Sequence, residues 1–200
     1  RLLQLDSKLV LITNGLLIVG ATLMLISIEW NTTLSQMDPV WRPFNALFQA
    51  LASRTAGFST VDFQDAHPST LFMWVGAMLI GGAAGSTTGG IKLATLAVLF
   101  LAVIATVRGQ EEPQAFGRRI TPNLVFRAMT IFALFMATHF LLTLLLAITE
   151  DVFNHASFGF VNLMFESMSG LATVGLSTGI TPDLSIPGKL ILLVAMFIGR

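Results

Sequence analysis

Long apolar runs alternate with short polar segments along this 200-residue chain. Leu9–Ile28 holds 20 residues without a charge, which is the length that a membrane-spanning helix needs. Leu71–Val107 is longer and is interrupted near its middle by glycines, Leu124–Ile148 spans again, and Leu190–Ile198 begins a further apolar stretch. The pattern predicts a polytopic, all-α membrane protein.

Two further apolar segments are too short to cross a bilayer. Phe44–Ser53 and Phe158–Gly170 have helical character, and each follows a long apolar run and a polar connection. Non-helical backbone at membrane depth is tolerated only where protein surrounds it or where it lines a water-filled space. We therefore expect each segment to be a pore helix that dips into the membrane and returns as a loop.

The loops that follow these short helices carry nearly the same sequence. Residues 55–60 and 173–178 share the pattern Thr-x-Gly-apolar-Ser-Thr, and they begin 118 positions apart (173 − 55). In potassium channels, the carbonyls of a Thr-Val-Gly-Tyr-Gly loop replace the hydration shell of the ion, and residues 173–175 match its first three residues. A single Thr-x-Gly triplet usually marks only a turn. The duplication, with a short helix before each copy, favours a pair of pore loops.

The expected ligands of this pore are backbone carbonyls. Glycine adopts unusual backbone angles without a Cβ clash, and the C-terminus of a pore helix carries partial negative charge that favours a cation. The predicted ion-binding filter consists of Thr55, Ala56, Gly57, Phe58, Thr173, Val174, Gly175 and Leu176. Because Phe58 and Leu176 stand where the potassium-channel loop has Tyr, we expect modest selectivity.

The middle of the second apolar run is rich in glycine. Five of the ten residues of Gly81–Gly90 are Gly, and each costs about 1 kcal/mol inside a helix, so the run should unwind. We interpret it as an intramembrane gate below the filter, formed by Gly81, Gly82, Gly85, Ser86, Thr87, Thr88, Gly89 and Gly90. Close helix packing through small residues is the alternative. A phosphate-binding loop is excluded, because Lys92 does not directly follow Gly90.

Composition and charge distribution narrow the function further. Only 11% of the residues are charged and 54% are hydrophobic, whereas a soluble domain carries about 25% charged residues. Arg1, Lys8 and the basic residues within 108–119 lie at one set of helix ends, so the positive-inside rule predicts that this side is cytoplasmic and that both Thr-x-Gly loops open outward. The chain has no Cys and three scattered His, so we expect no transition-metal site. Neither a nucleophile motif nor a nucleic-acid-binding surface is indicated, and we expect no enzyme activity.

The chain divides into two units that run in the same direction. We expect a helix–pore loop–helix unit with a broken second helix at residues 1–108, a cytoplasmic linker at residues 109–122, and a second unit at residues 123–200. The last helix stops after too few residues to cross, so we interpret the sequence as an internal piece of a longer protein.

Five ionisable residues lie in or near the apolar runs, where charges are costly and often functional. We expect Lys92 and Arg127 to extend to the membrane surface, with a gating role as the alternative for Lys92, and Arg54 to tie the first loop to its surroundings. Glu166 should accept hydrogen bonds from the filter backbone from behind. His139 should be a packed, hydrogen-bonded interior residue.

Four stretches of the chain resemble the Trk/Ktr/HKT superfamily of potassium-translocating subunits, and its bacterial members in particular. They are residues 53–62, 85–92, 173–179 and 196–200. The resemblance implies four helix–pore loop–helix repeats around a pseudo-fourfold pore, of which this chain holds the third and most of the fourth. It also implies that the glycine-rich run is a gate and that Arg200 is its latch.

The same resemblance implies the ion, the partners and the location. Potassium would be the transported ion, with sodium as a second candidate and no organic cofactor. Family members assemble as homodimers on a cytoplasmic ring of nucleotide-binding regulatory subunits, within the lipid of the plasma membrane, and no nucleic acid is involved. Two alternatives stay open. One is a secondary transporter of an organic solute, although that class usually shows inverted repeats. The other is a non-conducting scaffold subunit.

Overall fold

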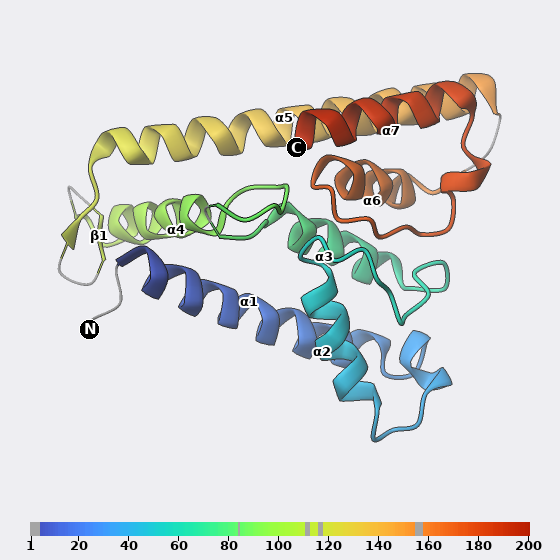
Figure 1. Cartoon of the computed structure of the whole chain (residues 1–200), viewed down its shortest axis with the longest axis horizontal. Coiled ribbons are helices and arrows are strands. Elements are labelled where there is room, and N and C mark those ends of the chain that lie inside the picture. Colours follow the sequence, from blue (N-terminus) through green and yellow to red (C-terminus); the bar gives the residue numbers. More distant parts are fainter. Residues whose placement is uncertain (1–4, 84, 111–112, 116–117, 155–157) are drawn as a thin grey trace.

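The computed structural model describes residues 5–83, 85–110, 113–115, 118–154 and 158–200. Three of its helices form successive layers in Figure 1: α1 (Leu5–Glu29) packs against α4 (Leu93–Val107), and α4 packs against α5 (Pro122–Phe153). Within these residues, parts of α1 and α5 are long and apolar enough to cross a membrane. The predicted all-α membrane architecture is confirmed.

The first unit follows the predicted order. After α1 come a short 3-10 helix η1 (Thr33–Gln36), the short helix α2 (Arg42–Ala52) and the returning helix α3 (Pro68–Leu79). Proline stands in the first turn of both α2 and α3, where its missing N–H costs nothing and its fixed φ suits the helix. The glycine-rich run unwinds as expected, since α3 ends at Leu79 and the next helix begins at Leu93.

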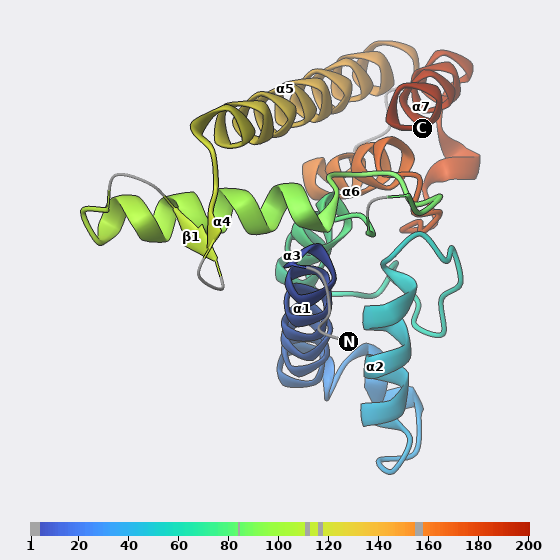
Figure 2. The ribbon, with the colours of Figure 1, turned by 60° about the vertical axis from the view of Figure 1, so that its left-hand side comes forward.

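The second unit repeats this order with α5, the short helix α6 (Phe160–Leu171), a short 3-10 helix η2 (Thr181–Asp183) and α7 (Ile186–Gly199). Seen from a second side, α6 lies between the layer of α5 and α7 and the helix α3 (Figure 2). Helix α5 continues past the apolar run Leu124–Ile148, through Phe153.

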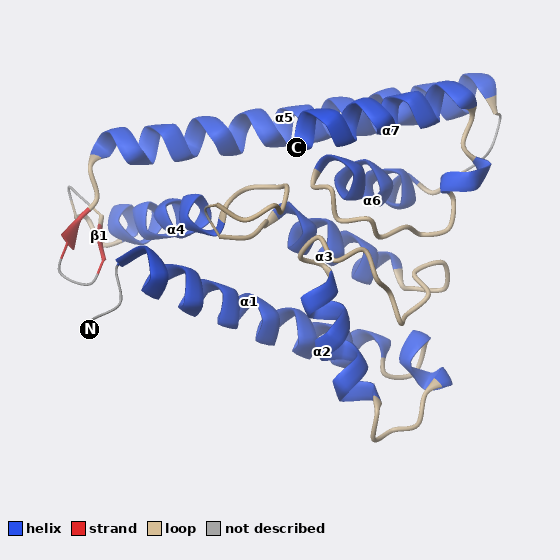
Figure 3. Ribbon diagram, in the orientation of Figure 1, coloured by secondary structure: helices blue, strands red, loops and turns tan. Residues whose placement is uncertain are grey.

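The linker between the units holds a small hairpin that the sequence did not predict. Strands β1 (Gln114–Ala115) and β2 (Arg118–Arg119) pair antiparallel, and they are the two arrows of Figure 3. Ile120 donates its N–H to the carbonyl of Pro113 at 2.9 Å, and both residues are buried. This pairing satisfies the backbone of a segment whose turn residues alone suggested only a loop.

An aromatic cluster joins the two units. Phe63, from the loop after the first filter stretch, packs against Trp74 of α3 with ring centroids 5.9 Å apart, and against Phe165 of α6 at 5.2 Å. All three side chains are almost fully buried. Burial of large aromatic side chains contributes strongly to stability, so this cluster fixes α6 and its loop relative to α3.

Each unit also has a buried glutamate at the end of its first helix. Glu29 of α1 accepts hydrogen bonds from the N–H of His67 (3.0 Å) and the hydroxyl of Thr70 (2.5 Å), at the start of α3. Glu150 of α5 accepts from the N–H (3.1 Å) and the hydroxyl (2.7 Å) of Ser185, the N-cap of α7. A carboxylate is stabilised at a helix N-terminus, so the same device holds the first helix to the returning helix in both units.

Candidate ion-conducting site

The two Thr-x-Gly loops face each other in the structure. A Cβ atom built on Gly175 would lie 3.2 Å from the Cα of Gly57, and one built on Gly57 would lie 3.4 Å from the carbonyl oxygen of Val174. The two loops therefore meet glycine to glycine, with the Val174 carbonyl turned toward the opposite loop. A side chain at either glycine would press against the backbone of the opposite loop.

Both loops share an unusual backbone conformation. Positive φ angles occur at Thr55 (61°) and Gly57 (73°) in the first loop, and at Thr173 (52°) and Gly175 (86°) in the second. Among the described residues, these two threonines are the non-glycine residues with positive φ. Such conformations cost energy for a β-branched residue and tend to occur at functional sites. Alternation of left-handed and ordinary residues is the arrangement that allows successive carbonyls to turn toward one side of a chain.

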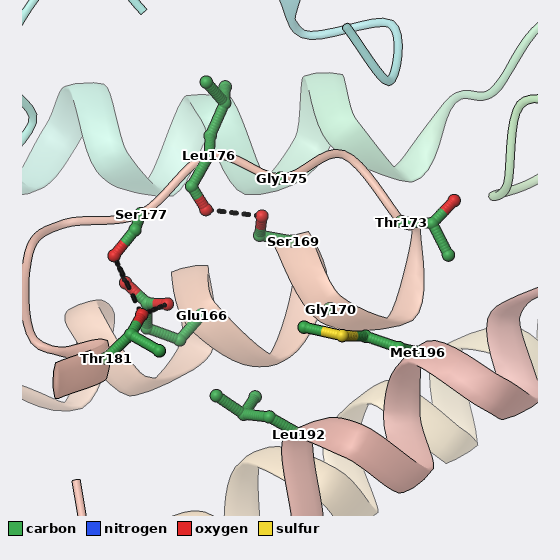
Figure 4. Close-up of a pocket in the computed structure, with 10 residues that line it drawn as sticks. All are labelled: Glu166, Ser169, Gly170, Thr173, Gly175, Leu176, Ser177, Thr181, Leu192 and Met196. Carbon is green, nitrogen blue, oxygen red and sulfur yellow. Dashed lines mark hydrogen bonds between the residues drawn. The ribbon is translucent and has the colours of Figure 1, made fainter. Parts of the chain in front are cut away.

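The second loop is anchored from behind by Glu166 of α6. Its carboxylate accepts hydrogen bonds from the Thr178 N–H (2.7 Å), the Ser177 hydroxyl (2.7 Å) and the Thr181 hydroxyl (2.7 Å). Figure 4 shows the carboxylate directed at Ser177 and Thr181, away from the Thr173 end of the loop. The prediction that Glu166 hydrogen-bonds the backbone of this loop is confirmed. Its backbone contact is with Thr178, which follows the four predicted filter residues 173–176.

Gln49 of α2 has the equivalent position in the first unit. Its side-chain oxygen accepts from the Ser59 hydroxyl (3.2 Å) and the Thr60 N–H (3.3 Å), while its Nε2 is buried without a partner among the described residues. Gln49 precedes Thr55 by six residues (55 − 49), and Glu166 precedes Thr173 by seven (173 − 166). Each of the two side chains holds the loop that follows its own helix.

One predicted ligand is engaged elsewhere. The carbonyl of Leu176 accepts a 2.5 Å hydrogen bond from the hydroxyl of Ser169, so it is turned back toward α6 (Figure 4). This contact engages one of the two lone pairs of the Leu176 carbonyl, and the role of Leu176 as an ion ligand stays a prediction. Ser169 is a positioning residue that sequence reasoning missed, since a serine in a pore helix carries no distinguishing pattern.

A cavity of about 380 Å³ lies beside the second loop. Thr173, Gly175 and Ser177 line it from the loop, and Leu192 and Met196 line it from α7 (Figure 4). The cavity therefore separates this side of the loop from α7.

The glycine-rich run forms a pinched loop, which we call the glycine loop (residues 81–90). Its two ends are joined by hydrogen bonds from the Gly81 N–H to the Ile91 carbonyl (2.8 Å) and from the Leu93 N–H to the Gly82 carbonyl (3.1 Å). A Cβ on Gly89 would lie 2.5 Å from the Ala172 carbonyl oxygen. The glycine loop therefore lies directly against the second Thr-x-Gly loop. Ala84 lies outside the described residues.

Three cationic side chains donate to carbonyls at the ends and tip of this loop. Arg54, which directly precedes Thr55, donates to the carbonyls of Ile80 (2.9 Å) and Gly81 (3.4 Å). Arg200, at the end of α7, donates to the Thr87 carbonyl at 3.3 Å. The sequence-based expectation for Arg54, a tie to its surroundings, is confirmed.

The expectation for Lys92 is wrong. Its ammonium group donates to the Thr88 carbonyl at 2.7 Å and to the Ser86 carbonyl at 3.3 Å, so it folds back into the glycine loop and does not extend to the membrane surface. Unsatisfied carbonyls at membrane depth are costly, and they attract a nearby cation more strongly than the distant interface does.

His139 is a packed interior residue, as predicted. Its side chain is 3% exposed, and its Nδ1 lies 3.3 Å from the hydroxyl of Ser167 on α6. Thr143 also contacts that hydroxyl, at 2.7 Å. This polar group connects α5 to the back of the pore helix, away from the loops.

Comparison with known proteins places the chain among cation transport proteins. The sequence model of the TrkH family, described as a cation transport protein, matches residues 2–200. The chain is 34% identical over 199 residues to the potassium/sodium uptake protein NtpJ of Enterococcus hirae, covering 99% of this chain and 44% of that protein. It is 35% identical over 199 residues to the Ktr system potassium uptake protein B of Bacillus subtilis, covering 98% of this chain and 43% of the relative.

A solved structure shares the fold. The crystal structure of the potassium transporter TrkH from Vibrio parahaemolyticus superimposes with a TM-score of 0.66 at 22% sequence identity, covering 98% of this chain and 42% of that one. The chain thus spans less than half the length of the relatives that it matches.

Proposed function

Because the chain belongs to the TrkH family of cation transport proteins, we propose that it forms part of a potassium-translocating pore in the plasma membrane. The observation that carries this proposal is the pair of Thr-x-Gly loops. Their alternating positive φ angles match at both positions, and the two loops approach each other at their glycines. Neighbouring loops that share a sequence pattern and a backbone conformation are what a selectivity filter requires.

The proposed ligands are the carbonyls of Thr55, Ala56 and Gly57 in the first loop, and the corresponding carbonyls of residues 173–175 in the second. The carbonyls of Phe58 and Leu176, the fourth residue of each stretch, stay candidates. Each carbonyl would replace one water molecule of a potassium ion. The C-terminal ends of α2 and α6 add negative potential near the loops.

We further propose that the glycine loop is the gate and that Arg200 is its latch. The loop lies against the carbonyl of Ala172, just before the second filter stretch, where it can block the path of an ion. Arg200 holds it through Thr87. The hydrogen-bonded neck joins the two ends of the loop, so that the loop can move as a unit once its latch is released.

Two loops do not encircle an ion. We propose that the rest of a longer protein supplies two more loops, which would complete a pseudo-fourfold pore. The remaining proposals are a homodimer of that full-length subunit, in membrane lipid, and a cytoplasmic ring of nucleotide-binding regulatory subunits. The relatives' names, a potassium/sodium uptake protein and a component of a Ktr system, support potassium with sodium as a second ion and support a multi-subunit system.

The two alternatives make different predictions. An organic-solute transporter would show solute-dependent uptake without dependence on alkali cations. A scaffold subunit would show no flux of either kind. Membership of a family of transport proteins supports a non-enzymatic role.

The direct test is uptake of potassium and rubidium by the full-length parent protein, expressed in cells that lack their own potassium uptake systems. We expect uptake that saturates with potassium and restores growth at low potassium concentration. Absence of alkali-cation uptake from a protein that reaches the membrane would contradict the proposal.

A further inference from the structure

Three consecutive carbonyls at the tip of the glycine loop are held by two cations. The carbonyls of Ser86 and Thr88 accept from the Lys92 ammonium group at 3.3 and 2.7 Å, and the intervening carbonyl of Thr87 accepts from the Arg200 guanidinium at 3.3 Å. We call residues 86–88 the loop tip. Lys92 stands at the start of α4 and Arg200 at the end of α7. The two cations therefore hold the loop tip from two different elements, which we call its two sides.

Lys92 lies at a position where the helix dipole disfavours a cation. It is the N-cap residue of α4, where the positive end of the helix dipole repels a positive charge. Its extended backbone (φ −62°, ψ 141°) and half-buried side chain direct the ammonium group back over the loop. The contact with the two loop-tip carbonyls offsets the unfavourable position, because charged hydrogen bonds are the stronger ones.

Neither cation is neutralised by an acid. Among the described residues, Lys92 and Arg200 donate to loop carbonyls and form no ion pair with a carboxylate. Their positive charges therefore act on whatever else enters this region. A potassium ion leaving the two Thr-x-Gly loops would meet both charges, together with carbonyls that are already occupied.

We propose that Lys92 is a second latch of the gate, and that it forms with Arg200 a two-sided clamp on the loop tip. This inference rests on the proposed function, because a clamp matters only if ions pass the glycine loop. The two latches lie in different parts of the chain: Lys92 follows the glycine loop by two residues (92 − 90), whereas Arg200 directly follows α7. Movement of α7 can release only one side, so full opening also requires the Lys92 contact to break.

The test uses thiol labelling of the loop tip in the full-length protein, in a background without other cysteines. This chain contributes none. Thr88→Cys, at a half-buried position beside the Gly82 N–H, is combined with Lys92→Met, with Lys92→Arg, or with the control Lys189→Met. Lys189 is an exposed lysine that also donates to a backbone carbonyl, that of Pro182 at 2.7 Å, far from the loop. A charged thiol reagent then reports how often the loop tip opens.

We expect Lys92→Met to raise the labelling rate about tenfold, since loss of a charged hydrogen bond has that effect on an opening equilibrium. Lys92→Arg and Lys189→Met should label at the parent rate. Equal rates in Lys92→Met and its parent would overturn the clamp, whether or not the protein transports ions. If Lys92→Met does not fold, Lys92→Gln replaces it under the same criterion.

Rubidium flux into liposomes separates this inference from the proposed function. If the parent conducts, Lys92→Met should raise basal flux, and Lys92→Met combined with Arg200→Gln should raise it further. A conducting parent with unchanged flux in Lys92→Met would overturn the second latch and leave the pore intact. A parent without flux would contradict the proposed function, and the labelling rates would then decide the clamp alone.

Discussion

The carboxylate of Glu166 accepts a 2.7 Å hydrogen bond from the backbone N–H of Thr178, directly behind the second Thr-x-Gly loop. Gln49 makes the same kind of contact with the N–H of Thr60 behind the first loop, at 3.3 Å. The Glu166 contact is the shorter of the two and involves a carboxylate, so it should be the stronger one. We infer that each pore helix positions its own loop through one side chain, and that the second loop is held more rigidly.

Glu166→Ala should weaken selectivity. It removes the acceptor of several hydrogen bonds and leaves the buried Thr178 N–H unsatisfied, at a cost of about 1–3 kcal/mol, so we expect the preference for potassium over sodium to fall about tenfold or more. Glu166→Gln should retain most of the preference, because its amide oxygen still accepts as Gln49 does. Competition of sodium against rubidium uptake measures this, with the exposed Asp151→Asn as control. Unchanged selectivity in Glu166→Ala would refute the positioning role.

Glu29→Ala should lower stability and leave selectivity intact. Glu29 is fully buried and accepts hydrogen bonds from His67 and Thr70 at the start of α3. Its loss leaves two donors without a partner, so we expect a cost of about 2–6 kcal/mol. Thermal unfolding of the detergent-solubilised full-length protein measures the change, beside the exposed Asp38→Asn. An unchanged unfolding temperature would show that the link between α1 and α3 contributes little.

Gly89→Ala should make the gate leak. The new Cβ would lie 2.5 Å from the backbone oxygen of Ala172, which cannot move aside as a flexible side chain could, so the glycine loop must shift away from the filter loop. We expect higher basal rubidium flux in liposomes. Gly76→Ala is the matched control, because nothing lies within 4 Å of its Cβ position. Flux that falls or stays constant in Gly89→Ala would contradict a blocking role for the loop.

The elements with strong local signals were predictable from the sequence. The apolar lengths identified the long helices, and the glycine cluster identified the break between α3 and α4, because both effects act through composition over many residues. The repeated Thr-x-Gly pattern indicated two equivalent loops. Their contact at Gly57 and Gly175 depends on how distant helices pack, which no local pattern encodes.

Contacts between a side chain and a distant backbone were the least predictable. Lys92 was expected at the membrane surface, because a lysine near a helix end usually extends there. The unwound carbonyls of Ser86 and Thr88 override that tendency. Ser169 and Leu176 show the same limit, since the hydroxyl that turns the Leu176 carbonyl away becomes visible only when the loop is folded back on α6.

The central claim, that the two Thr-x-Gly loops form a selectivity filter, is tested most directly by Gly175→Ser in the full-length protein. Gly175 has a φ of 86°, which costs a residue with a side chain about 1–2 kcal/mol, and the added Cβ would lie 3.2 Å from the Cα of Gly57. The control is Gly15→Ser, at an open helical position. The measurement is rubidium uptake under sodium competition. We predict that Gly175→Ser loses the preference for potassium while Gly15→Ser keeps it. A preserved preference in Gly175→Ser would contradict the filter.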